Sequence, residues 1–165
     1  MIEAIKSFFL DTVGREFCVL FCSMLPIIEL RGAIPLGVGL GLSSWQTFTL
    51  SIVGNLLPIP FLLLLWRWAL GMMHRIRWTQ GFALWLEKRA ERSRGTLERW
   101  EFWGLLLFVA IPLPGTGAWT GSLAAAVMGM RFWKAMLAIL LGVLLAGVVM
   151  TLISYGAVAA FQAWF

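Results

Sequence analysis

The sequence predicts an all-α integral membrane protein built as an inverted repeat, each half a re-entrant hairpin followed by a transmembrane helix. Its 165 residues are 61% hydrophobic and only 13% charged, with a mean hydropathy of +0.88, which is too apolar for an ordinary soluble domain. Prolines and glycines interrupt the apolar stretches, and most charges gather in one segment. We expect a single membrane domain over 1–165, with a first repeat at 1–70, a basic amphipathic linker at 71–101 and a second repeat at 102–165.

The first repeat places a carboxylate and a guanidinium inside an apolar run. After an N-terminal segment (1–15) that is too short and charged to span the bilayer and is expected at the interface, residues 26–37 read P-I-I-E-L-R-G-A-I-P-L-G. Glu29 and Arg31 would point about 200° apart on a continuous helix, so they face one cavity more easily if the backbone breaks between Arg31 and Pro35. We expect Pro26, Gly32 and Pro35 to form the turn. Such a break survives at membrane depth only where it is buried or lines a polar cavity.

A second apolar run extends to about Leu70. Ser43 is a helix cap and Trp45 an interfacial anchor at its start. The run is long enough to cross the membrane, and its prolines predict a kink near the middle, where Asn55 offers a polar group.

Residues 71–101 carry most of the charges of the chain. Aromatic and leucine residues recur among them at roughly helical spacing, including Trp78, Phe82, Trp85 and Trp100. This pattern predicts an amphipathic helix or hairpin on the membrane surface, with its basic face toward anionic lipid. A solvated linker is the alternative.

The second repeat begins with an apolar stretch, 102–130, that contains I-P-L-P-G-T-G-A-W-T-G-S. An uninterrupted helix through this sequence is improbable, and we expect a turn at Pro112, Pro114, Gly115 and Gly117. The last run, 135–160, is free of charge and predicts a transmembrane helix. The small residues Gly142, Ala146 and Gly147 would let another helix approach closely.

A shift of 88 residues aligns the two halves, placing Pro26 on Pro114, Trp45 on Trp133 and Gly54 on Gly142. With two crossings and two re-entrant hairpins, ten positive residues lie on one face, against Lys6 and Arg15 on the other. Residues 71–101 are then cytoplasmic, in a multi-pass protein of a bacterial cytoplasmic (inner) membrane. Four full crossings are the alternative, with a poorer charge asymmetry.

The polar residues of the two interrupted stretches are the candidate site. Glu29 is a proton-coupling group whose pKa burial would raise and Arg31 would lower, and Arg31 is a donor fork for an anionic headgroup. Asn55, Thr116 and Thr120 are further substrate-binding candidates. The structural alternative is a static Glu29–Arg31 pair, with glycine and proline merely permitting the turns.

The motifs E-L-R-G-A-I-P (29–35) and P-L-P-G-T-G-A-W-T-G (112–121) make the chain resemble the small multi-drug export protein family, which is itself similar in plan to the DedA (VTT) membrane proteins. The resemblance implies two facing re-entrant hairpins and, by analogy with DedA relatives, proton-coupled movement of a lipid or other amphiphile. Those relatives carry charged residues on both hairpins, whereas the second hairpin of this chain offers Thr116 and Thr120.

Together these features predict a transporter or flippase for an anionic, lipid-like amphiphile. The alternatives are an exporter of cationic drugs, in which Glu29 meets the cation, and a non-transporting membrane organiser. An enzyme is not expected, because the sequence shows no nucleophile–base pair and no metal cluster. We expect membrane lipids and a homodimer or other homo-oligomer as partners, and no cofactor, metal or nucleic acid.

Overall fold

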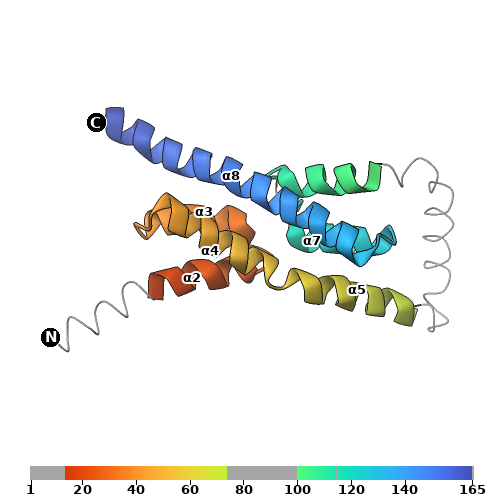
Figure 1. Cartoon of the computed structure of the whole chain (residues 1–165). Helices are drawn as coiled ribbons and strands as arrows, with labels where there is room; N and C mark the ends of the chain where they lie inside the picture. The colour runs from red at the N-terminus through yellow and green to blue at the C-terminus, as the bar shows by residue number, and fades with distance from the viewer. Residues whose placement is uncertain (1–13, 74–99, 114, 165) are drawn as a thin grey trace. The chain divides into compact units, whose positions relative to one another are not determined.

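A computed structural model of the chain describes residues 14–73, 100–113 and 115–164. Within these ranges all regular structure is helical, as expected: α2 (Gly14–Met24), α3 (Glu29–Gly39), α4 (Ser44–Leu56), α5 (Ile59–Met73), a helix over Trp100–Ala110, α7 (Ala118–Val127) and α8 (Phe132–Trp164) (Figure 1). The expected interfacial segment at 1–15 and the expected linker at 71–101 fall almost wholly outside the described residues.

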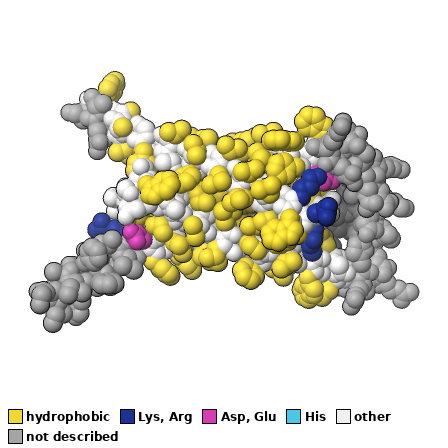
Figure 2. Space-filling view, viewed as in Figure 1, with side chains coloured by type: hydrophobic (Ala, Val, Ile, Leu, Met, Phe, Trp, Pro, Cys, Tyr) yellow, Lys and Arg dark blue, Asp and Glu magenta, His cyan; other side chains and the backbone are white. Residues whose placement is uncertain are grey.

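Two helical stretches are long and apolar enough to cross a membrane, Ser44–Met72 and Phe132–Ala160. Large apolar side chains lie exposed on both, among them Phe61 at 70% and Leu152 at 69%. Hydrophobic side chains cover most of the described surface in Figure 2, and the charged ones gather in small groups. An exposed apolar surface of this extent is typical of a protein that meets lipid.

The chain divides into two compact units whose boundaries cut both long helices. Unit 1 comprises 1–58 and 143–165, and therefore contains α2, α3, α4 and the C-terminal part of α8. Unit 2 comprises 59–142, and contains α5, the Trp100–Ala110 helix, α7 and the N-terminal part of α8. Each unit thus combines two short helices with one part of each long helix.

The break in the first apolar run precedes Glu29. Helix α2 ends at Met24, residues 25–28 form a turn, and α3 continues through Gly32 and Pro35. The expected break between Arg31 and Pro35 is therefore wrong. Pro26 explains the observed position, because proline has no N–H to extend α2 and disfavours helix at the residue before it. Gly32 serves packing instead, since a Cβ there would lie 2.6 Å from Ile28 Cγ2.

The expected cap and kink of the second run are both confirmed. Ser43 caps α4 through a capping box, accepting from the Gln46 N–H while the Gln46 side chain accepts from the Ser43 N–H. Helix α4 ends at Leu56 and α5 begins at Ile59. Pro58 and Pro60 cause the interruption, because neither can donate to the carbonyl four residues earlier.

Close backbone approach holds unit 1 together. A Cβ on Gly54 of α4 would lie 2.0 Å from Ser23 Oγ and 2.3 Å from the Leu20 carbonyl oxygen of α2. A Cβ on Gly147 of α8 would lie 2.7 Å from the Ile52 side chain of α4. The expectation that small residues of the last helix admit a close neighbour is confirmed here.

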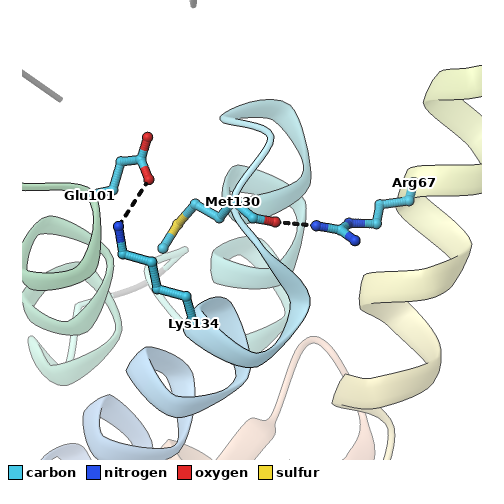
Figure 3. A network of polar contacts seen from close by, with 4 residues as sticks. All are labelled: Arg67, Glu101, Met130 and Lys134. Atoms are coloured by element: carbon cyan, nitrogen blue, oxygen red, sulfur yellow. Dashed lines mark hydrogen bonds and ion pairs between the residues drawn. The ribbon is translucent and has the colours of Figure 1, made fainter. Parts of the chain in front are cut away.

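Unit 2 shows the same kind of packing. A Cβ on Gly142 of α8 would lie 2.9 Å from the Leu106 carbonyl oxygen. The Arg67 guanidinium of α5 donates to the Met130 carbonyl oxygen beyond the end of α7, and Lys134 Nζ lies 3.5 Å from Glu101 Oε2 (Figure 3).

Corresponding contacts recur in the two units at a spacing of 88 residues. The turn after α3 and the turn after α7 each contain a glycine with positive φ, Gly41 at 75° and Gly129 at 69°. In both turns the next residue donates to a carbonyl five residues earlier, Leu42 to Gly37 and Met130 to Ala125, each at 3.0 Å. The Leu42 carbonyl then accepts from Tyr155 Oη, and the Met130 carbonyl accepts from Arg67, again 88 residues apart.

Candidate functional site

The interior of unit 1 is unusually polar for a membrane protein. Five polar side chains are at most 7% exposed there: Ser23, Glu29, Thr47, Ser51 and Asn55. Polar groups in such surroundings are costly unless they are hydrogen-bonded or serve a function. The charged residues among the described part of unit 1 are Arg15, Glu16, Glu29 and Arg31.

Glu29 begins α3 directly after the turn. The backbone N–H of Glu29 donates to the Leu25 carbonyl oxygen at 2.9 Å. The backbone φ of Glu29 is +50°, and the residue is 7% exposed. A left-handed conformation costs a non-glycine residue of order 1–3 kcal/mol and is concentrated at functional sites. Arg31 is half-buried two residues later and is attracted electrostatically to the Glu29 carboxylate.

Glu29 lies at the same level as Asn55 along two neighbouring helices. Helices α3 and α4 are joined by a short turn and contact each other, and a Cβ on Gly37 would lie 2.4 Å from the Thr47 side chain. Eight residues back along α3 from Gly37 lead to Glu29, and eight forward along α4 from Thr47 lead to Asn55, about 12 Å in each case. Glu29 and Asn55 therefore lie at a similar height along α3 and α4.

A row of polar side chains follows α4 from Asn55 to its start. Thr47, Ser51 and Asn55 are four residues apart, so they share one helix face, and each is 0% exposed. On α8, Thr151 and Tyr155 share a face with Gly147, which packs against α4. Tyr155 Oη lies 2.9 Å from Thr47 Oγ1 and donates to the Leu42 carbonyl oxygen at 2.7 Å. We call these five polar residues the α4–α8 seam.

Several seam atoms have no hydrogen-bond partner among the described residues. They are Ser51 Oγ, both amide atoms of Asn55 and Thr151 Oγ1, and all are buried. An unsatisfied buried polar group costs about 1–3 kcal/mol. The seam therefore has unused capacity to bind a polar species.

The remaining candidates, Thr116 and Thr120, belong to unit 2. Thr116 Oγ1 donates to the Ile111 and Leu113 carbonyl oxygens at 2.8 and 2.9 Å, and Thr120 Oγ1 donates to the Gly117 carbonyl oxygen at 3.1 Å. Both hydroxyls thus stabilise the backbone between the Trp100–Ala110 helix and α7. The residues Pro112, Gly115 and Gly117 lie in this non-helical connection, whereas Pro114 lies outside the described residues.

Sequence reasoning selected Glu29, Arg31 and Asn55 but missed the other polar residues of unit 1. A signal was present, because Thr47, Ser51 and Asn55 recur at helical spacing in an apolar run, as do Thr151 and Tyr155. The pairing of these two rows depends on the packing of α4 against α8, which spacing alone does not reveal.

Comparison with known proteins identifies a family. A family model described as "Putative small multi-drug export protein" matches residues 29–149, most of the chain. A search of curated proteins found no match. A search of solved structures also found none. The match includes Glu29, Arg31 and the α4 part of the seam, and the chain belongs to the small multi-drug export protein family.

Proposed function

We propose that the chain crosses the membrane twice, through α4–α5 and through α8, and that α2–α3 and the Trp100–Ala110 helix with α7 are re-entrant hairpins of an inverted repeat. Each of the four short helices has 10 or 11 residues, about 15–17 Å, roughly half of a hydrocarbon core of about 30 Å. The contacts repeated at 88 residues support two equivalent halves. A single crossing separates the hairpins, so they enter from opposite faces.

In this topology the basic residues Arg67, Arg131 and Lys134 lie on the same face as residues 74–99. That face is the cytoplasm, and the membrane is the bacterial inner membrane. Exposed tryptophans at the helix starts, Trp45 at 72% and Trp133 at 80%, suit the two interfaces.

The protein transports an amphiphile with an anionic headgroup, exchanging a proton at Glu29. The observation that carries this proposal is the burial of Glu29 at the height of Asn55. Asn55 lies three residues before Pro58, and Pro58 is the middle residue of the 29-residue span Ser44–Met72. Ionisable groups at membrane depth mark transport paths. The Arg31 guanidinium has five N–H donors, more than one carboxylate uses, so it can also bind a phosphate or carboxylate headgroup.

A lipid-exchange assay tests this function. The purified chain is placed in liposomes with a fluorescent anionic phospholipid, and dithionite quenching measures its transfer between leaflets with and without a proton gradient. Loss of a charge-assisted hydrogen bond costs about 1.5–3 kcal/mol, so Arg31→Gln lowers transfer roughly tenfold or more. Lys134→Gln, which removes an ion-paired cation from unit 2, is the matched control and retains transfer.

The double variant Glu29→Gln/Arg31→Gln separates function from stability. Removing Glu29 or Arg31 alone leaves the other charge without its partner in the interior, whereas removing both leaves no uncompensated charge. We expect the double variant to fold like the wild type and to transfer no lipid. Wild-type transfer by a folded double variant would show that the pair is only structural.

Export of cationic drugs is the second candidate, favoured by the description of the family. Here the Glu29 carboxylate is the counter-ion of the cation, and Arg31 is dispensable. Cells expressing Arg31→Gln would then resist lipophilic cations while cells expressing Glu29→Gln would not, at equal protein abundance. Under the anionic-substrate proposal, by contrast, Arg31→Gln loses transport.

We further propose that membrane lipids surround the chain and that it forms a homodimer, because two crossings bury little apolar surface by themselves. Native mass spectrometry of the protein released from nanodiscs measures the subunit number. A monomer under all conditions would refute this proposal.

A further inference from the structure

Three positions of the seam are polar in unit 1 and apolar in unit 2. At a spacing of 88 residues, Thr47, Ser51 and Thr151 correspond to Ala135, Ile139 and Leu63. These three counterparts are 1%, 0% and 2% exposed, as deeply buried as Thr47 and Ser51, whereas the Thr151 residue is half-buried. The packing of a unit therefore does not require hydroxyls there, and their presence in unit 1 needs another explanation.

In the proposed topology, the seam extends from the middle of the membrane to one face. Asn55 lies near the middle of the span Ser44–Met72, and Thr47 lies eight residues away, about 12 Å, against a half-thickness of about 15 Å. Beyond Thr47 the chain offers groups suited to water. Arg15 donates to the Leu40 carbonyl oxygen at 3.2 Å, and Gln46 donates to Glu16 at 3.3 Å.

Water satisfies the requirements of the seam. Buried polar atoms that lack protein partners are normally satisfied by buried water, which makes about three hydrogen bonds each. Ser51 and Asn55 supply such atoms in a row on α4, and Thr151 supplies one on α8. Thr47 and Tyr155 continue the row to the start of α4. At the equivalent positions of unit 2, Ala135, Ile139 and Leu63 carry no polar side-chain atom, and Arg67, the counterpart of Tyr155, donates to the Met130 carbonyl oxygen.

We propose that the α4–α8 seam is an aqueous half-channel that conducts protons between Glu29 and the membrane face at which α4 begins. A proton released by the Glu29 carboxyl passes along waters and hydroxyls, each of which accepts one proton and donates another. The described counterparts in unit 2, Ala135, Ile139 and Leu63, supply no such hydroxyls. The use of these protons in transport rests on the proposed function, whereas the hydration of the seam does not.

Cysteine accessibility tests the hydration. In a background with Cys18→Ala and Cys22→Ala, Ser51→Cys and Thr151→Cys are compared with their counterparts Ile139→Cys and Leu63→Cys. The full chain in liposomes is treated with methanethiosulfonate ethylammonium, and intact mass follows the reaction. The thiolate attacks the reagent and displaces methanesulfinate, and a one-unit rise in thiol pKa in apolar surroundings lowers the thiolate fraction tenfold, so the seam cysteines react at least about tenfold faster. Val53→Cys, half-exposed on α4, controls for contact with lipid.

The outcomes are distinct. Equal rates at the seam and its counterparts would overturn the half-channel, whether all four were slow or all four fast. Seam rates no higher than that of Val53→Cys would indicate access through lipid and would also overturn it. Size-exclusion chromatography verifies folding, and the two seam positions lie on different helices, so one remains informative if the other variant aggregates.

Infrared spectroscopy tests the proton path. The Glu29 carboxylic acid band, assigned by its loss in Glu29→Gln, is followed at acidic pH after transfer to heavy water. Ser51→Ile introduces the residue found at the unit 2 counterpart and slows deuterium exchange of this band. Unchanged exchange, or no such band at any pH at which the chain is folded, would overturn proton conduction. Lipid transfer that fails while the seam stays reactive refutes the proposed function and leaves the half-channel standing.

Discussion

Glu29 combines two unfavourable features, a buried carboxylate and a left-handed backbone. The backbone conformation follows from Pro26, which ends α2 and makes the chain turn before α3 starts. Glycine would adopt the same φ without steric cost. A glutamate at this place therefore sacrifices stability, and its side chain in the polar interior of unit 1 offers the physical reason.

We expect Glu29→Gly to be more stable than Glu29→Ala by about 1 kcal/mol, because both remove the carboxylate and only alanine retains the penalty of positive φ. Thermal unfolding of the two purified variants in the same detergent measures the difference. At Gly14, where a Cβ meets nothing within 4 Å and φ is not positive, alanine brings no such penalty and serves as a control. Greater stability of Glu29→Ala would contradict the left-handed geometry.

The helices pack through glycines that bring backbone against backbone. Gly54 in α4 and Gly142 in α8 are 88 residues apart, and each faces a carbonyl oxygen of the first short helix of its unit, Leu20 or Leu106. A carbonyl fixed in a helix cannot move aside as a flexible side chain can. These two contacts thus determine how closely each short helix approaches its long one.

Gly54→Ala is expected to destabilise the protein by at least about 2 kcal/mol, because the added Cβ would overlap the Leu20 carbonyl oxygen. Gly156→Ala meets nothing within 4 Å and, in a helix interior, should gain about 0.5–1 kcal/mol. Unfolding curves or the yield of monodisperse protein measure the stability of both variants. A neutral Gly54→Ala would be incompatible with the described approach of α2.

Tyr155 makes hydrogen bonds that join α8 to Thr47 of α4 and to Leu42 in the turn before α4. Tyr155→Phe should cost about 1–2 kcal/mol, because it removes one donor and leaves the Leu42 carbonyl unsatisfied. Thr47→Val is the control, because it removes only the contact between Thr47 and Tyr155 and should therefore cost less stability than Tyr155→Phe. Equal stability of wild type and Tyr155→Phe would show that water replaces these bonds fully.

At the scale of the whole molecule, the number of crossings determines where the termini lie. Two crossings place the C-terminus on the face opposite residues 74–99. Four crossings place it on the same face. The short helices, at about 15–17 Å each, favour the first arrangement.

Reporter fusions distinguish the two topologies. Alkaline phosphatase is active only outside the cytoplasm and green fluorescent protein fluoresces only inside, so a fusion after Phe165 should give phosphatase activity and one inserted near residue 90 should fluoresce. Charge reversal provides a control, since replacing Arg131 and Lys134 with glutamate removes positive charge from the cytoplasmic face and should weaken this orientation. Fluorescence from both fusions would establish four crossings.

The sequence by itself determined the helical membrane class, the long charge-free helix, the Ser43 cap and the kink at Pro58, because each depends on local composition or on one proline or capping residue. The position of the break before Glu29 required the structure, since Pro26, Gly32 and Pro35 all have the local chemistry for a turn. The structure places the turn at Pro26, and Gly32, within α3, packs against Ile28. Only tertiary structure decided that Tyr155 of α8 contacts Thr47 of α4, and that Ile139 and Leu63 are buried where Ser51 and Thr151 have their counterparts. Thr47 and Tyr155, 108 positions apart, meet through helix packing, which no local propensity encodes.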